Sequence, residues 1–316
     1  MSVMQITLFL VGGLLLLVAG GEILVRGSVG LAKRFNVSPL IIGLTIVSFG
    51  TSSPELLVSL KAAISGYSAL SLGNVIGSNI GNIAVILGIA AIIYPISISK
   101  QIIKKEMPIL IGVTLFSILF LLDGKLTRLE GFIFFAGLIV YVVVGYKLSR
   151  THSNEVVPST EVEDIKPMNF GISAVLIIGG LLMLVYGGNL FVDGAVAIAK
   201  SFNMSEAVIG LTIVAIGTSL PEFFTSLVAA LKKEADIAIG NIIGSNIFNL
   251  IGILGLTAIV KPIETDSMSY VDFGLMFLLT LFLFPLLKTG MKLNRLEGLF
   301  LVFVYIGYVV YLLNFS

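Results

Sequence analysis

A gapless internal repeat constrains the fold of this chain more than any other feature of its sequence. With a shift of 167 residues, FNVSPLIIGLTIVSFGTSSPE at 35–55 matches FNMSEAVIGLTIVAIGTSLPE at 202–222, and fourteen of the twenty-one positions are identical. The same shift aligns GNVIGSNIGNIAVILG at 73–88 with GNIIGSNIFNLIGILG at 240–255. The protein is therefore predicted to consist of one structural unit used twice.

The composition places this repeat in a membrane. Hydrophobic residues make up 57% of the chain and charged residues 12%, with a mean hydropathy of +1.09, so polar surface is too scarce to cover a soluble globule. A net charge of +1 gives no indication of a nucleic-acid partner. Cysteine is absent, which excludes disulfides and thiolate metal sites. We expect the lipid bilayer to be the main partner of this surface.

The apolar segments predict an all-α integral membrane protein with ten transmembrane helices, five in each repeat. Each segment is near the length of about 20 residues that a span needs. The segments lie near 3–32, 39–64, 69–94, 107–122, 129–146, 169–199, 206–231, 236–260, 269–287 and 296–315. We expect residues 1–150 to form the first five-helix repeat and 169–316 the second.

The segment between the repeats, 151–168, is polar, acidic and contains two prolines. Such a composition predicts a linker without a hydrophobic core of its own. It contains His152, the only histidine, which we interpret as a solvated side chain because no ligand cluster surrounds it in the sequence.

Five spans per repeat predict that the second repeat is inverted relative to the first. The distribution of positive charge agrees, because one set of alternate connections carries fourteen lysine and arginine residues and the other set five. By the positive-inside rule the richer side is cytoplasmic. This predicts a cell-membrane protein with both termini outside and the linker in the cytoplasm.

Two glutamates stand in the middle of predicted spans. Glu55 and Glu222 are equivalent by the 167-residue shift, and each ends a repeated motif, GTSSPE at 50–55 and GTSLPE at 217–222. Since a charge at the centre of the bilayer costs on the order of 2.5–3.5 kcal/mol on insertion scales, such residues are usually functional. The alternative, a pair of protonated packing residues, is less compatible with their symmetric occurrence.

The residues before each glutamate predict a break in the membrane helix. Proline lacks a backbone donor, so Pro54 and Pro221 should interrupt helices 2 and 7 and free carbonyl oxygens there. Thr51 and Ser52 stand four and three positions before Glu55, and we expect their hydroxyls to share its helical face. By the same spacing, we expect the hydroxyls of Thr218 and Ser219 to share the helical face of Glu222.

A second set of oxygen-bearing residues lies in GSNIGN at 77–82 and GSNIFN at 244–249. Ser78 with Asn82, and Ser245 with Asn249, are again four residues apart. Together with the carboxylates they predict an all-oxygen shell of the kind that hard cations such as calcium and sodium prefer. For these four residues, hydrogen bonding between helices is the alternative.

Three further polar residues are expected to have structural roles. Asn79 and Asn246 fall on another helical face, where bonding to backbone is the favoured interpretation. Glu22 has Asn189 as its equivalent and Arg26 one turn away, which predicts an interfacial ion pair.

At these motifs the chain resembles the cation/calcium exchanger superfamily, whose two repeats carry G-T-S-x-P-E and G-N-x-x-G-S-N. The resemblance covers essentially the whole chain and is closest to the prokaryotic sodium/calcium exchangers. It implies ten helices in inverted repeats and no resident cofactor. It also implies cation coordination by side chains of both repeats: Glu55, Glu222, Thr51, Ser52, Ser78, Asn82, Thr218, Ser219, Ser245 and Asn249. The backbone oxygens of Ser48 and Ala215 would join them.

One position departs from some relatives. At Asn249 certain archaeal and potassium-dependent members carry aspartate, so the asparagine here removes a third carboxylate and argues against potassium co-transport. The resemblance thus implies an antiporter that exchanges Na⁺ for Ca²⁺ by alternating access. With both carboxylates ionised one calcium ion would neutralise the site, whereas three sodium ions, the usual number in the family, would leave a positive charge, so that exchange would be electrogenic and would expel calcium.

Other functions remain open at the level of sequence. A buried carboxylate can exchange a proton for a cation, which makes exchange of H⁺ for Ca²⁺ or another divalent ion the nearest alternative. An intramembrane enzyme is a distant one, because no nucleophile or metal-binding histidine accompanies the glutamates. A channel is also less compatible with paired inverted repeats than alternating access. We therefore expect a transporter and not an enzyme.

Overall fold

The computed structural model describes residues 2–151, 168–202, 215–265 and 268–315, and it is almost entirely helical. The first repeat contains α1 (Val3–Phe35), α2 (Pro39–Ile42), the π-helical η1 (Gly43–Val47), α3 (Ser48–Thr51), α4 (Ser53–Ile64), α5 (Ser68–Gly81), the π-helical η2 (Asn82–Leu87), α6 (Gly88–Ile93), β1 (Ile96–Ser97), the π-helical η3 (Ile102–Glu106), α7 (Met107–Leu121), β2 (Lys125–Leu126) and α8 (Arg128–Thr151). The second contains α9 (Phe170–Ser201), α11 (Ala215–Thr218), α12 (Leu220–Leu231), α13 (Ala235–Ile247), the π-helical η6 (Phe248–Ile253), α14 (Leu254–Val260), β3 (Ile263–Glu264), α15 (Tyr270–Lys288), the 3₁₀ turn η7 (Thr289–Met291), β4 (Lys292–Leu293) and α16 (Arg295–Phe315).

Seven helices among the described residues are long and apolar enough to cross a membrane, and an eighth span results if the bent pair α2–α4 is counted as one. Of the other predicted spans, 107–122 is α7 with 15 residues, and 206–231 begins in the undescribed segment 203–214 and ends in α12. The helical membrane class is confirmed, while the total of ten spans stays a prediction. Most of the predicted linker, His152 included, lies outside the described residues.

Four very short strands show how the two repeats are oriented. Strand β1 pairs antiparallel with β4, and β2 pairs antiparallel with β3. By the 167-residue shift β1 is equivalent to β3 and β2 to β4, so each strand pairs with the strand that is not its own equivalent. The connection after the third span of one repeat therefore lies beside the connection before the last span of the other. Repeats in the same orientation would place these connections on opposite sides, whereas inverted repeats bring them together.

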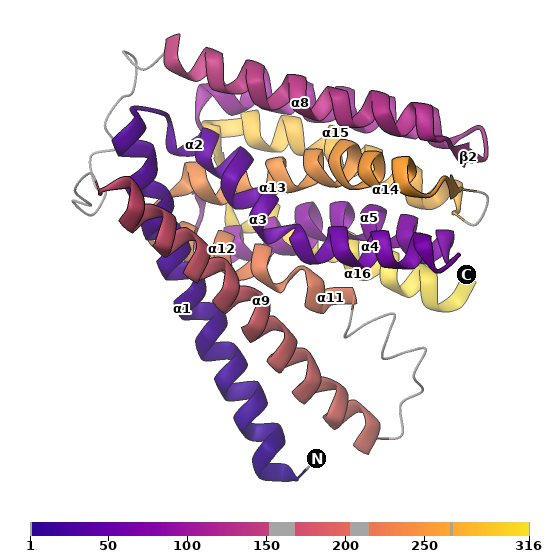
Figure 1. Ribbon diagram of the computed structural model, residues 1–316, viewed down its shortest axis with the longest axis horizontal. Coiled ribbons are helices and arrows are strands. Elements are labelled where there is room, and N and C mark those ends of the chain that lie inside the picture. The colour runs from indigo at the N-terminus through magenta and orange to yellow at the C-terminus, as the bar shows by residue number, and fades with distance from the viewer. Residues whose placement is uncertain (1, 152–167, 203–214, 266–267, 316) are drawn as a thin grey trace.

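The two longest helices, α1 and α9, lie side by side along one flank of the bundle (Figure 1). Glycines at seven-residue intervals permit this contact: Gly13 and Gly20 on α1 face Gly187 and Gly180 on α9. A Cβ added at Gly180 would lie 2.7 Å from the backbone nitrogen of Leu24. Because larger side chains cannot enter this seam, the backbones of α1 and α9 approach closely along much of their length.

The proline-containing helix of the first repeat is broken, as predicted. Residues Pro39–Thr51 and Ser53–Ile64 are inclined by 45° to each other. Ser52 stands at the break with φ −80° and ψ 8°, outside regular helical geometry. The equivalent residue Ser219 has φ −91° and ψ 5°. Both breaks lie in the interior of the bundle, where unwound backbone is tolerated in a membrane protein.

Candidate cation site

Each break places one glutamate in the first turn of the helix that follows it. Glu55 lies at the start of α4 and Glu222 at the start of α12, and each is only 1% exposed. The two carboxylates are close enough for the charge of Glu222 to act on Glu55. The structure thus brings the two repeated motifs together in the interior.

The hydroxyl groups of each motif contact the glutamate of the other repeat. Ser52 Oγ donates to Glu222 Oε1 at 2.8 Å, and Ser219 Oγ donates to Glu55 Oε1 at 3.0 Å. The Thr51 side chain also lies near Glu222. Helical spacing from Glu55 did not predict this contact with the glutamate of the partner repeat. It arises at the break, where the backbone of Ser52 leaves regular helical geometry.

The Thr218 side chain likewise lies near Glu55. Ser245 joins this network from α13, because its Oγ lies at hydrogen-bonding distance, 3.0 Å, from Ser52 Oγ. Ser78 lies on α5 and is 8% exposed. Of the two backbone positions, Ser48 O accepts from Thr51 Oγ1 at 3.3 Å, and Ala215 is the first residue of α11, directly after undescribed residues.

Several buried oxygens of this region have no hydrogen-bond partner in the described part of the chain. They include Oε2 of both Glu55 and Glu222, and Oδ1 of both Asn82 and Asn249. Both asparagines are 1% exposed and stand within the first two residues of π-helical segments, η2 and η6. Such π-helical turns occur often at functional sites. An unpaired buried oxygen is costly, so these atoms are suited to a ligand that accepts their lone pairs.

Two residues that support the glutamates were missed by the sequence analysis. Asn74 donates to Glu55 O at 3.1 Å and to Ser59 Oγ at 2.8 Å. Its equivalent Asn241 donates to Glu222 O at 3.3 Å and to Ser226 Oγ at 2.9 Å. The signal was present, since both asparagines belong to the repeated GN-x-x-GSN motif. Their amide groups hold the first turn of α4 and α12 rather than pointing at the carboxylates.

Asn241 has a further contact, because its Oδ1 accepts a 3.1 Å hydrogen bond from Thr51 Oγ1. The expected structural role of Asn79 and Asn246 is confirmed. Asn79 donates to Val75 O at 2.8 Å and Asn246 donates to Asn79 O at 3.4 Å. Asn246 Oδ1 also accepts from Asn82 Nδ2 at 2.9 Å. This contact fixes the orientation of the Asn82 amide and leaves its Oδ1 without a partner among the described residues.

Helix α9 covers both breaks from the flank of the bundle. A Cβ on Gly50 would lie 2.6 Å from Leu181 Cδ1, and one on Gly217 would overlap Val192. Outside the site, Glu22 pairs with Lys232 at 3.0 Å instead of the predicted Arg26. The prediction used only spacing along one helix, whereas the ion pair joins Glu22 of α1 to Lys232, the residue that follows α12.

The chemistry of the site is that of a hard-cation site. Two carboxylates, serine and threonine hydroxyls and asparagine oxygens converge, and oxygen ligands of this kind suit calcium and sodium. Among the described residues there is no group of three or more His, Cys, Asp or Glu side chains that could hold a metal. When both carboxylates are ionised, their negative charge balances the positive charge of one divalent cation.

Comparison with known proteins assigns both halves of the chain to one family. The model described as "Sodium/calcium exchanger protein" matches residues 5–147 and again residues 172–314. CaxA of Alkalimonas amylolytica is 42% identical over 309 residues, covering 96% of this chain and 97% of that protein. The sodium/calcium exchanger MaX1 of Methanosarcina acetivorans is 30% identical, covering 96% and 97%. A structure of the sodium-calcium exchanger NCX_Mj soaked with Na⁺ and Sr²⁺ superposes with a TM-score of 0.84 at 33% identity over 100% of both chains.

Proposed function

The chain belongs to the sodium/calcium exchanger family, and we propose that it is a secondary antiporter that exchanges Na⁺ for Ca²⁺ across a membrane by alternating access. Both repeats match the family, and the relative MaX1 and the structural neighbour NCX_Mj are named as sodium/calcium exchangers. The transported ions are its substrates, and no catalytic step is involved.

One observation carries the proposal more than any other: each glutamate offers a buried oxygen without a partner while its second oxygen is held by the opposite repeat. A calcium ion between Glu55 and Glu222 would neutralise both carboxylates. It would also join two helices from different repeats, so that binding and release become coupled to the relative position of those helices. This is the coupling that alternating access requires.

We propose that the neutral oxygens complete the shell. Calcium takes about 6–8 oxygen ligands at 2.3–2.6 Å, more than two carboxylates supply. The oxygens available come from hydroxyl and amide side chains of both repeats and from two backbone positions: Thr51, Ser52, Ser78, Asn82, Thr218, Ser219, Ser245, Asn249, Ser48 and Ala215. Sodium, an ion of lower charge with the same preference for oxygen ligands, would use overlapping subsets of these residues.

The number of sodium ions decides whether exchange moves charge. Three sodium ions in exchange for one calcium ion carry one more positive charge than they replace, so exchange in that ratio would be electrogenic. In a cell with an inward sodium gradient such a protein expels calcium. We further propose that the termini face the outside and that the linker is cytoplasmic, because fourteen of nineteen lysine and arginine residues then lie on the cytoplasmic side.

We propose that opening of the site involves the flank formed by α1 and α9. In the described conformation both glutamates are 1% exposed, so ions cannot reach them from either side without a rearrangement. Leu181 and Val192 of α9 press on the glycines of the two breaks. Displacement of α9 would therefore uncover the breaks and the glutamates beside them.

Calcium flux in proteoliposomes tests this function. The purified protein is reconstituted, and calcium uptake is recorded under an imposed sodium gradient, an imposed proton gradient and no gradient. We expect uptake only when the sodium gradient is present. Uptake driven by protons would assign the protein to H⁺/Ca²⁺ exchange instead, and gradient-independent flux would indicate a channel.

A further inference from the structure

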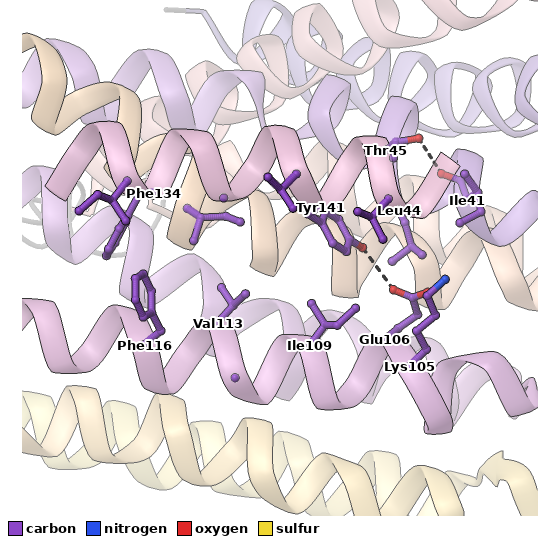
Figure 2. A pocket seen from close by; sticks show the side chains of 17 residues that line it. Ile41, Leu44, Thr45, Lys105, Glu106, Ile109, Val113, Phe116, Phe134 and Tyr141 are labelled. Carbon is purple, nitrogen blue, oxygen red and sulfur yellow. Dashed lines mark hydrogen bonds between the residues drawn. The ribbon is translucent and has the colours of Figure 1, made fainter. Parts of the chain in front are cut away.

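A groove that contains none of the proposed cation ligands lies between α7 and α8 (Figure 2). Its volume is about 530 Å³, and its floor is formed by η1 and η6, the segments that flank the cation site. Phe116, Val113 and Ile109 of α7 point toward Phe134 and Tyr141 of α8. The lining is apolar over most of its length, and polar groups gather at one end only.

Glycines keep this groove open. Gly112 on α7 and Gly137 and Gly145 on α8 line it, and a Cβ at any of them would meet no atom within 4 Å. Gly131, which also lies on α8, differs from these three glycines, because a Cβ there would lie 2.8 Å from Gly255 O. Close packing of helices therefore explains Gly131 but not the three groove glycines.

The second repeat has side chains where the first has this open space. By the 167-residue shift the equivalents of the three groove glycines are Leu279, Val304 and Leu312. Leu279 is buried in the core and Val304 packs against it. The groove is thus a property of the first repeat, and the symmetry of the ion site does not account for it.

The charged end of the groove also differs between the repeats. Lys105 and Glu106 lie there, and Tyr141 OH donates to Glu106 Oε2 at 3.4 Å (Figure 2). Gln101 Nε2 donates to Glu106 Oε1 at 3.1 Å. In the second repeat the equivalent tyrosine, Tyr308, donates instead to Asp272, which occupies the position equivalent to Lys105. The first repeat therefore has a half-buried cation where the second has a carboxylate.

The dimensions and the exposure of the groove indicate its occupant. From Lys105 in η3 to Phe116 in α7 the helical backbone rises roughly 16 Å at about 1.5 Å per residue. This is about half of the ~30 Å hydrocarbon core and so matches one leaflet. The lining residues Val140 and Val144 are 60% and 44% exposed, so the groove opens toward the surface that lipid covers. Lys104, the preceding residue in the chain, is a second cation and is exposed.

We propose that this groove binds one acyl chain of an anionic phospholipid, whose phosphate pairs with Lys105. The lysine end lies on the side rich in positive charge, and a basic pocket between membrane helices on that side is suited to an anionic headgroup. The chain fills the space left by the glycines and rests against η1 and η6. The bound lipid would thereby support η1, which leads directly into Ser48, and η6, which carries Asn249.

Native mass spectrometry of the full-length protein in detergent tests this proposal independently of transport. Delipidated protein is titrated with phosphatidylglycerol or with phosphatidylcholine of the same chain length. We expect one tightly bound phosphatidylglycerol in the native protein. Gly137→Leu, which fills the groove, should weaken that binding at least about tenfold. Gly307→Leu, at an exposed position of α16 where a Cβ also meets nothing within 4 Å, is the matched control and should leave it unchanged.

The charge is tested by a second pair of variants. Lys105→Gln should reduce the preference for phosphatidylglycerol over phosphatidylcholine about fivefold, whereas the exposed Lys104→Gln should have a smaller effect. If Gly137→Leu lowers the folded yield, Gly112→Leu fills the groove from the opposite wall. Equal lipid binding by native protein, Gly137→Leu and Gly112→Leu would overturn the proposal. A dimer that Gly137→Leu dissociates would also overturn it, because a second copy would then fill the groove.

Discussion

Ser52 Oγ lies 2.8 Å from Glu222 Oε1, so a hydroxyl of one repeat holds the carboxylate of the other. The mirror contact, Ser219 to Glu55 at 3.0 Å, makes the arrangement reciprocal. Each glutamate therefore stands on its own helix but is oriented by the opposite repeat. A cation bound by both would report on the position of the two repeats relative to each other.

Loss of a cross-repeat hydroxyl should weaken calcium binding. Ser52→Ala removes a hydrogen bond to a charged group, worth about 1.5–3 kcal/mol, so the KM for calcium in exchange assays should rise by about tenfold or more. Ser219→Ala should act similarly. Ser53→Ala is the matched control, because the exposed Ser53 hydroxyl bonds only to Phe49 O among the described residues. Equal KM values for the Ser52 and Ser53 variants would contradict this role.

The second prediction concerns Asn241, which bonds Glu222 O, Ser226 Oγ and Thr51 Oγ1. Asn241→Ala leaves these buried groups without their partner, at a cost on the order of 1–3 kcal/mol for each unsatisfied group. We expect a lower Tm in detergent together with a raised KM for calcium. Ser226→Ala removes one of the three contacts and should have the smaller effect on both. A variant with unchanged Tm and KM would show that Asn241 does not hold this turn.

Two adjacent glycines of α9 test the close contact with α1. A Cβ at Gly180 would lie 2.8 Å from Gly20 O, whereas a Cβ at Gly179 would meet nothing within 4 Å. Gly180→Ala should destabilise the protein by about 1–3 kcal/mol through overpacking. Gly179→Ala should be neutral or stabilising by up to about 1 kcal/mol, since alanine favours helix over glycine. Thermal unfolding measured in one detergent compares them, and similar Tm shifts would refute the seam.

A buried carboxylate outside the spans predicts a pH-dependent stability. Burial raises the pKa of Glu234, with Lys33 opposing the shift and Asp236 adding to it. A raised folded-state pKa means that the folded protein binds this proton more tightly than the unfolded chain, so stability falls as pH rises from the ordinary glutamate value through the folded-state value. Glu234→Gln should therefore raise Tm at pH 8 but hardly at pH 4. The exposed Glu264→Gln is the control, and a gain of the same size at both pH values would count against the assignment.

The sequence predicted the helical membrane class, the repeat and the two glutamates because each leaves a local signature. An apolar span, a repeated motif and a charge within a span are all visible in the order of residues. The inversion followed from an odd number of spans, and the pairing of β1 with β4 agrees with it.

What the sequence could not supply is contact across the repeats. Helical spacing from Glu55 did not predict that the Ser52 hydroxyl contacts Glu222 of the other repeat at the break. For the same reason Glu22 was assigned to Arg26 on its own helix and not to Lys232. Asn74 and Asn241 were visible in the repeated motif, but their spacing did not show that their amides reach the backbone carbonyls of Glu55 and Glu222.

The most direct test of the account is sodium-driven calcium uptake by proteoliposomes that contain native protein, Glu55→Gln or Glu222→Gln. Glutamine keeps the size and one acceptor oxygen but removes the charge that neutralises calcium. The account predicts uptake by the native protein and none above empty liposomes for either variant, with both variants folded as judged by thermal unfolding. Uptake by either variant at a rate comparable to that of the native protein would contradict it.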